Sequence, residues 1–255
     1  MRAPLCRPLK WIGSNRPRRK ATVMDQIRNY GDIKQTMFCA YCGGPTETRD
    51  HVPSKVFLDD PYPTNLPVVP ACKACNQSFS KDEEYVACLV ECVLSGSGEP
   101  DRVEREKIKR IIRKKPALAA RLRNARQETP AGTSLIVETK RVQNVVLKLA
   151  RGHAAFELNE PQLDDPSNLS FLPFPSMAPG VRENFEAPFS QSGSLAVWPE
   201  VGSRAMQRLV NVETGASAWI TAQPGRYRYL TSLDGEVAVR IVIGEYLACE
   251  VNWSF

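Results

Sequence analysis

The chain has 255 residues, of which 42% are hydrophobic, and a formal net charge of +6. This length and composition allow a substantial core and indicate a soluble globular protein of one or two domains. No run of about 18 apolar residues is present, which excludes a transmembrane helix. The first twenty residues lack the apolar segment of roughly 7–15 residues that an export signal needs. We therefore expect a cytoplasmic protein that has no membrane partner.

A basic segment opens the chain. Residues 1–20 contain seven Lys or Arg residues and no acidic residue, whereas the rest of the chain is close to neutral. We expect residues 1–30 to form a disordered arm, and Met24 is an alternative start because the patterned part of the sequence begins soon after it. Such an arm either follows a phosphate backbone, where it releases counterions, or is a solvated tail.

Two pairs of cysteines follow in the stretches FCAYCGG and ACKACN, and they are Cys39, Cys42, Cys72 and Cys75. Two C-x-x-C pairs at this separation are typical of a structural zinc site made of four thiolates. The glycines after the first pair permit the tight turn that such a site requires. The alternative is two unrelated pairs of buried cysteines. The other four, Cys6, Cys88, Cys92 and Cys249, have no ligand spacing, and we expect Cys88 and Cys92 to be core residues.

The stretch TRDHVPSK lies between the two cysteine pairs and contains Asp50 and His51. If four thiolates complete the zinc site, His51 is free to act as a base, since an imidazole with a pKa near 6.5 can accept a proton at neutral pH. Val52 and Pro53 favour an extended backbone, so Asp50 and His51 should point to opposite faces. The alternative for the pair is a hydrogen-bonded turn without chemistry.

A helix is predicted after the second cysteine pair, in NQSFSKDEEYVACLVECVL, because apolar residues recur there with near-helical spacing. Asn76 falls at the start of this helix. The acidic residues Asp82, Glu83 and Glu84 lie in its first turns, where we expect them to complement the helix dipole.

Taken together, the order C-x-x-C, D-H-V-P, an Asn in TNLPVVP, and C-x-x-C-N resembles the zinc-clamped HNH endonucleases of the ββα-metal class, over about residues 36–94. The resemblance implies a treble-clef-like ββα unit that grips one divalent metal. It implies that His51 is the general base, that Asp50 and Asn76 hold the catalytic metal, and that Asn65 orients His51. Two departures are that Asn76 stands where many members have His, and that Ser54-Lys55-Val56-Phe57 replaces a common Gly-Gly.

The chemistry of these residues agrees with that resemblance. A carboxylate and an amide oxygen are hard ligands suited to Mg²⁺ or Mn²⁺, and such an ion can neutralise charge on a phosphorane and on the leaving oxygen. Zinc would serve as the scaffold, because so small a unit cannot hold these groups by packing alone. Lys55 and Lys81 flank the predicted site and are either phosphate contacts or solvated surface.

We therefore expect a Mg²⁺- or Mn²⁺-dependent HNH endonuclease that hydrolyses phosphodiester bonds in nucleic acid, with DNA as the expected partner and with a structural Zn²⁺. Two other classes stay open. One is a zinc-dependent module that binds nucleic acid without cutting it, and the other is a zinc-stabilised protein-interaction module.

The predicted fold is α+β, with a nuclease domain at 31–95, a basic helical segment at 96–130 and a mixed α/β domain with antiparallel hairpins at 131–255. SGSGEP, at 95–100, is a predicted linker. Between residues 102 and 126 eleven Lys or Arg residues accompany two Glu residues, and Pro116 interrupts or restarts the helix. This basic segment either contacts phosphates or is a solvated helix face.

The remaining elements are a strand in SLIVE and an amphipathic helix in KRVQNVVLKLARG with Gly152 as its C-cap. His153 follows that helix, and we expect it to be structural. A Pro-rich stretch at 160–180 can form neither a long helix nor a central strand, and antiparallel hairpins are expected beyond about Ser194, with a turn at 233–235. Tyr227, Tyr229 and Trp253 should fill a sheet face rather than stack on bases. We expect this half to target or regulate the nuclease, through a partner protein or a regulatory ligand.

Overall fold

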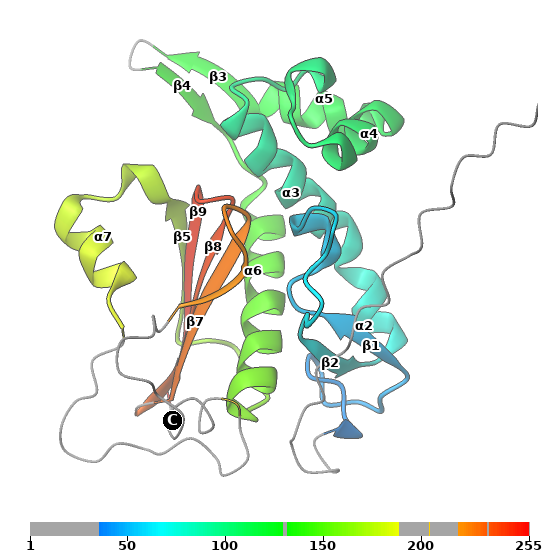
Figure 1. Cartoon of the computed structure of the whole chain (residues 1–255), viewed down its shortest axis with the longest axis vertical. Helices are drawn as coiled ribbons and strands as arrows, with labels where there is room; N and C mark the ends of the chain where they lie inside the picture. Colours follow the sequence, from blue (N-terminus) through cyan, green and yellow to red (C-terminus); the bar gives the residue numbers. More distant parts are fainter. Residues whose placement is uncertain (1–35, 130–131, 189–203, 205–218, 234, 255) are drawn as a thin grey trace, which may run out of the picture.

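The computed structural model describes residues 36–129, 132–188, 204, 219–233 and 235–254, and its fold is α+β with antiparallel sheets (Figure 1). The predictions for the basic arm at 1–30, including Met24 and Cys6, lie outside these residues. None of the helices within these ranges has the length and apolar character needed to cross a bilayer.

The first part of the fold is a hairpin followed by two helices. Strands β1 (Thr48–His51) and β2 (Val68–Ala71) pair antiparallel and flank the short helix η1 (Lys55–Phe57). The helix predicted after the second cysteine pair is present as two pieces, α2 (Lys73–Ser78) and α3 (Ser80–Leu94), which meet at Phe79. The hairpin and α2 therefore follow one another in the order β, β, α.

A helical pair comes next. Helix η2 (Pro100–Arg102) leads to α4 (Glu106–Lys114) and α5 (Pro116–Ala125), and Pro116 starts the second helix, as its fixed φ favours. Strands β3 (Arg126–Thr129) and β4 (Gly132–Leu135) form a second small antiparallel sheet. The predicted linker at 95–100 is a structured turn, since Ser97 is buried and its hydroxyl accepts a hydrogen bond from the Glu99 amide.

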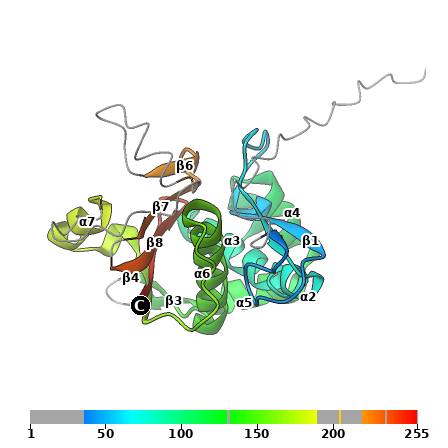
Figure 2. The same ribbon diagram turned by 90° about the horizontal axis from the view of Figure 1, so that it is seen from below.

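Helix α6 (Thr139–His153) lies between the N-terminal unit and the large sheet (Figure 2). It continues into a π-helical turn, η3 (Ala154–Leu158), and ends at Asn159, whose φ is 60°. The predicted C-cap at Gly152 was therefore wrong, because Gly152 lies inside the helix. Its small size serves packing instead: a Cβ at this position would lie 2.6 Å from Val52 Cγ2.

Gly152→Ala is expected to destabilise the protein by about 1–3 kcal/mol, because overpacking against the fully buried Val52 outweighs the higher helix propensity of Ala. Urea unfolding of the variant and the parent measures the difference. Gly180→Ala, in helix α7 (Pro179–Glu186), is the matched control, because nothing lies within 4 Å of the place that its Cβ would occupy. The double variant Val52→Ala/Gly152→Ala should lose less than the sum of the two single changes, and strict additivity would contradict the assigned contact.

The C-terminal half is a five-stranded antiparallel sheet in the order β5-β9-β8-β7-β6. Its strands are β5 (Asn168–Pro173), β6 (Ile220–Gln223), β7 (Tyr227–Leu233), β8 (Glu236–Ile243) and β9 (Leu247–Ser254). The Pro-rich stretch supplies β5, and an edge position suits it because prolines there break no central ladder. Gly235, with a φ of +72°, lies in the predicted turn between β7 and β8.

One continuous core contains residues from all three predicted segments. Val52, Ile108, Leu149 and Val239 belong to the same cluster of buried side chains. Tyr227, Tyr229 and Trp253 are also buried in it, as expected of residues that fill a sheet face. Helix α6 therefore packs against the hairpin unit on one side and against the sheet on the other.

His153 lies in this core, at the end of α6. It is fully buried, its Nε2 lies 2.8 Å from the Tyr227 hydroxyl, and its ring stacks on Tyr229 with centroids 3.7 Å apart. Burial, and secondarily the charge of Lys148, hold the pKa of His153 well below its usual value of 6.5. These contacts give the residue a structural environment.

Because the unfolded chain binds a proton at His153 that the folded chain does not, stability is expected to fall as the pH drops below about 6.5, with a limiting slope of about 1.4 kcal/mol per pH unit from this residue. Urea unfolding at pH 7 and pH 5.5 tests this. His153→Gln should reduce the slope without removing it, since the pKa of His51 is also lowered. Equal slopes in the parent and the variant would contradict the prediction.

Candidate functional site

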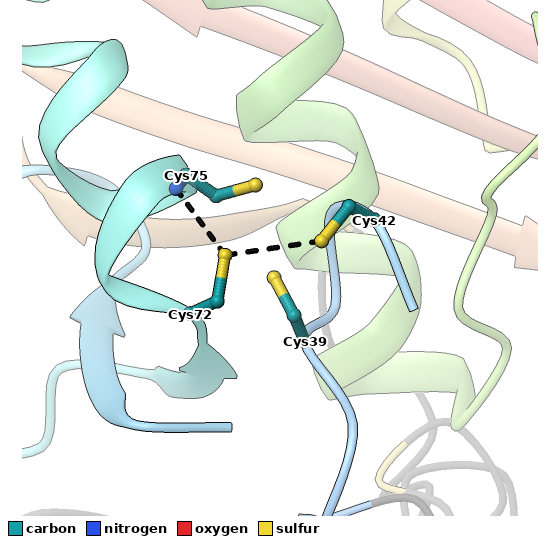
Figure 3. Close-up of side chains that lie close together, drawn as sticks. All are labelled: Cys39, Cys42, Cys72 and Cys75. Carbon is teal, nitrogen blue, oxygen red and sulfur yellow. Dashed lines mark hydrogen bonds between the residues drawn. The ribbon is translucent and has the colours of Figure 1, made fainter. Parts of the chain in front are cut away.

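Four cysteine sulfurs converge where the chain enters α2 (Figure 3). The Sγ atoms of Cys39, Cys42, Cys72 and Cys75 all lie within 4.8 Å of one another, and the Cys42 and Cys72 sulfurs are 3.8 Å apart. Ligands about 2.3 Å from a tetrahedral zinc are separated by roughly 3.8 Å. The four cysteines could therefore hold a metal ion such as zinc, and the donor set fits that ion.

Local backbone geometry brings the two halves of this cluster into place. The Cys39 amide donates to the Gly44 carbonyl at 2.7 Å, and Gly43 closes the turn with a φ of +70°. Cys72 is the N-cap of α2, where its sulfur accepts a hydrogen bond from the Cys75 amide at 3.3 Å. This hydrogen bond lowers the pKa of the Cys72 thiol, which favours the thiolate that zinc binds.

The remaining described cysteines lie apart from the cluster. Cys88, Cys92 and Cys249 are buried, and burial raises the pKa of Cys92 to about 11. Cys88 and Cys92 are thus core residues, as predicted. Within the described ranges, the four clustered cysteines form the only group of three or more Cys, His, Asp or Glu residues with metal-binding spacing.

Asp50 points into the protein from β1. Its Oδ2 atom accepts a hydrogen bond from the Tyr41 hydroxyl and forms an ion pair with Lys148 Nζ, each at 2.8 Å. Its Oδ1 atom has no hydrogen-bond partner among the described residues, and the side chain keeps 11% of its surface exposed. One oxygen of the carboxylate is therefore engaged, and the other is available to a ligand.

His51 is the next residue on β1, so its side chain projects from the other face of the strand. It is half-buried, and its Nδ1 atom is buried without a hydrogen-bond partner among the described residues. Burial lowers the pKa of His51, and the nearby charges of Lys55 and Lys148 lower it further, against an opposing effect of Asp50. The imidazole is therefore neutral at pH 7 and able to accept a proton.

Asn76 lies on α2 and spans the gap to β1. Its Nδ2 atom donates to Thr48 Oγ1 at 3.1 Å and to the Arg49 carbonyl at 3.3 Å. This arrangement leaves its amide oxygen free of hydrogen bonds to described residues. Thr48 and Asp50 share one face of β1, so Asn76 lies on the same face as Asp50. Carboxylate and amide oxygens are hard ligands of the type that Mg²⁺ and Mn²⁺ take in proteins.

The other predicted site residues differ in their surroundings. Lys55 lies close enough to His51 to affect its pKa, and its ammonium is 5.6 Å from the centre of the Tyr62 ring. Asn65 is exposed and lines a cavity of about 90 Å³ with Phe156 and Tyr229, and no hydrogen bond joins it to His51. Lys81 is exposed on α3. Of the predicted site residues, Asp50, His51 and Lys55 therefore lie near one another. Asn65 and Lys81 make no direct contact with these three residues.

The acidic residues at the start of α3 have partners beyond the helix dipole. Asp82 pairs with Arg141 at 2.5 Å, Glu83 pairs with Lys148 at 2.6 Å, and Glu84 pairs with Lys115. Lys148 was not among the predicted site residues. The sequence feature that could have identified it is its position: Lys148 comes three residues after Val145 and four before Gly152, so it lies on the otherwise apolar face of the helix.

Part of the basic segment is also structural. Arg105 is buried, and its Nε atom lies 2.6 Å from Asp59 Oδ1, while Lys107 donates to the carbonyls of Lys55 and Leu58. Burial tends to raise the pKa of Asp59, but Arg105 and Arg226 outweigh it and lower that pKa. These two basic residues of the segment, Arg105 and Lys107, therefore fix the loop that follows His51.

Comparison of the chain with protein-family models, with curated proteins and with solved structures finds no match. A functional argument for this chain therefore depends on the residues of the hairpin, the cysteine cluster and α2 themselves.

Proposed function

We propose that this chain is a Mg²⁺- or Mn²⁺-dependent endonuclease of the HNH type, with a zinc-stabilised ββα unit as its catalytic core. The observation that carries the proposal is the arrangement of β1, β2 and α2 around the four-cysteine cluster, with Asp50 and His51 at the end of β1 and Asn76 on α2. This order of elements and residues is the one that the resemblance to HNH endonucleases implies.

In the proposed reaction, His51 takes a proton from the water that attacks the phosphorus atom. A neutral imidazole suits this role, and the lowered pKa of His51 keeps it in that form at pH 7. Asp50 and Asn76 would hold the divalent ion, which supplies positive charge to the phosphate and the leaving oxygen. Asn65 is proposed to orient His51 only once substrate is bound, since the two residues share no hydrogen bond in this structure.

Nucleic acid, with DNA as the expected substrate, is the proposed partner. Lys55 beside His51 supports this, and so do exposed basic residues on α4 and α5, among them Arg110, Lys114, Arg121 and Arg123. Contacts of this kind neutralise phosphates without reading base sequence, so we propose weak sequence preference. Targeting or regulation would then fall to the C-terminal sheet.

A second candidate is a zinc-dependent module that binds nucleic acid without cutting it. The contacts of Asp50 with Lys148 and Tyr41 favour this candidate, because a purely structural carboxylate would make the same contacts. Binding alone does not require an unpartnered imidazole next to that carboxylate, which is why the nuclease is the first proposal.

Cleavage assays separate the two candidates. The zinc-loaded protein is incubated with supercoiled plasmid, single-stranded DNA and RNA, with Mg²⁺ or Mn²⁺ or with a chelator of these ions. We expect metal-dependent nicking by the parent and none by His51→Ala. Binding to labelled DNA without cleavage under every condition would favour the binding module and exclude the nuclease.

A further inference from the structure

We propose that Lys148, on helix α6 in the C-terminal half, is a positioning residue for Asp50 that sets both the orientation and the ligand strength of this carboxylate. The inference rests on the proposed function, because it assigns Asp50 to the catalytic metal. Lys148 lies 94 residues beyond Ser54 in the sequence, yet its ammonium group is in contact with the D-H-V-P-S stretch of the hairpin.

The surroundings of Lys148 hold its ammonium group in one place. The residue is 2% exposed, and its Nζ atom donates hydrogen bonds to Glu83 Oε1 at 2.6 Å and Ser54 Oγ at 2.8 Å and forms an ion pair with Asp50 Oδ2 at 2.8 Å. Two hydrogen bonds and one ion pair therefore restrain the ammonium group on three sides. Gly152 lies one turn further along the same helix and packs against Val52, which holds this face of α6 against the hairpin.

The same contacts determine which oxygen of Asp50 can bind a metal. Tyr41 donates a hydrogen bond to Oδ2 and Lys148 forms an ion pair with the same oxygen, so rotation of the carboxylate would break both contacts. Oδ1 is left as a single ligand atom in a fixed direction. A catalytic metal site requires that neighbouring residues hold each ligating side chain in one orientation.

The charges of Asp50, Glu83 and Lys148 also favour a cation at this site. Asp50 and Glu83 are two carboxylates that share one ammonium group, so one negative charge remains unbalanced in a nearly buried place. A cation at Asp50 Oδ1 would balance it. Lys148 also weakens this binding, because a positive charge a few ångströms away repels a divalent ion. We infer a site that binds its metal weakly and in one geometry.

Lys148→Met tests the inference in the full-length, zinc-loaded chain. Without the repelling charge, Mn²⁺ binding, followed by calorimetry and by the electron paramagnetic resonance signal of free Mn²⁺, should tighten by about tenfold or more. Without the fixed geometry, kcat for plasmid nicking at saturating Mn²⁺ should fall by about tenfold or more. Lys148→Arg should recover part of kcat, and Lys140→Met, at an exposed position of the same helix, should change neither quantity.

A merely structural role gives a different result. If Lys148 only stabilises the fold, kcat falls in proportion to the folded fraction, measured by thermal unfolding, and Mn²⁺ affinity does not tighten. Unchanged or weaker Mn²⁺ binding in folded Lys148→Met overturns the inference. The double variant Lys148→Met/Glu83→Gln keeps the net charge around Asp50, because it removes one positive and one negative charge. Recovery of the parental kcat in this folded variant would overturn the positioning role of Lys148.

Failure of the proposed function is distinguishable from failure of this inference. Absence of cleavage by the parent on every substrate ends the nuclease proposal, whatever Lys148 does. Cleavage by the parent that is lost in His51→Ala, together with parental Mn²⁺ affinity and kcat in Lys148→Met, ends the inference about Lys148 alone. Asp50→Ala is the reference for the binding experiment, because it should abolish the Mn²⁺ site in both the parent and the Lys148→Met background.

Discussion

Cys72→Ser is expected to abolish zinc binding and to unfold the hairpin and α2. This residue contributes one of the four sulfurs and also caps α2 through the hydrogen bond from the Cys75 amide. Zinc binding to four-ligand sites contributes about 10–16 kcal/mol in zinc-finger peptides, which is as large as the whole stability of a typical domain, about 5–15 kcal/mol. We expect the zinc content, measured by mass spectrometry of the intact protein, to fall from one ion per chain to none, with early loss of far-ultraviolet circular dichroism on heating.

Two control variants make this result specific. Cys92→Ser changes a buried cysteine outside the cluster and should keep one zinc per chain. Asp50→Ala removes a proposed ligand of the catalytic metal and should also keep the zinc. Zinc loss in Asp50→Ala would mean that the two sets of ligands are assigned wrongly, and full zinc content in Cys72→Ser would exclude the four-sulfur site.

His51→Ala is expected to reduce the cleavage rate by about 10²–10⁴-fold, the usual contribution of a general base. The physical reason is that the lowered pKa of His51 keeps the imidazole neutral at pH 7, while no other imidazole in the described chain is exposed, since His153 lies in the core. Single-turnover nicking of plasmid at saturating Mn²⁺ measures the loss without interference from product release.

The variant must stay folded for that comparison to count. His51 is at the end of β1 and is half-buried, so we expect its replacement to leave the zinc content and the thermal unfolding midpoint close to those of the parent. Equal cleavage by folded His51→Ala and by the parent would remove His51 from the mechanism. Addition of free imidazole to His51→Ala offers a further check, because partial recovery of the rate points to the missing base itself.

Local sequence patterns predicted a good part of the fold. The two C-x-x-C pairs indicated one four-sulfur cluster, because each pair lies within a turn that brings its own sulfurs together and so only one long-range contact had to be inferred. Strand alternation placed Asp50 and His51 on opposite faces of β1, and Pro116 marked the start of α5. The hairpins of the C-terminal sheet followed from alternation and from the glycine of the turn between β7 and β8.

The surroundings of the candidate site depended on contacts between distant parts of the chain. Gly152 suggested a helix end, but its role is to let α6 approach Val52, which no pattern within the helix reveals. Arg105 belonged to a basic run that suggested solvent or phosphate, yet it is buried against Asp59. Residue type and periodicity describe one element at a time, so they cannot tell which buried partner a charged side chain meets.

The sequence by itself determined which residues are chemically able to act: four thiolates, an imidazole beside a carboxylate, and an amide at the start of a helix. Only the tertiary structure decided how they are held. It directed Asp50 Oδ2 to Lys148 and Tyr41, left Oδ1 without a partner among the described residues, and buried His51 Nδ1. The physical reason is that spacing along the chain sets the order and the faces of neighbouring residues, whereas the electrostatic environment of a site is set by packing of α6 and α3 against the hairpin.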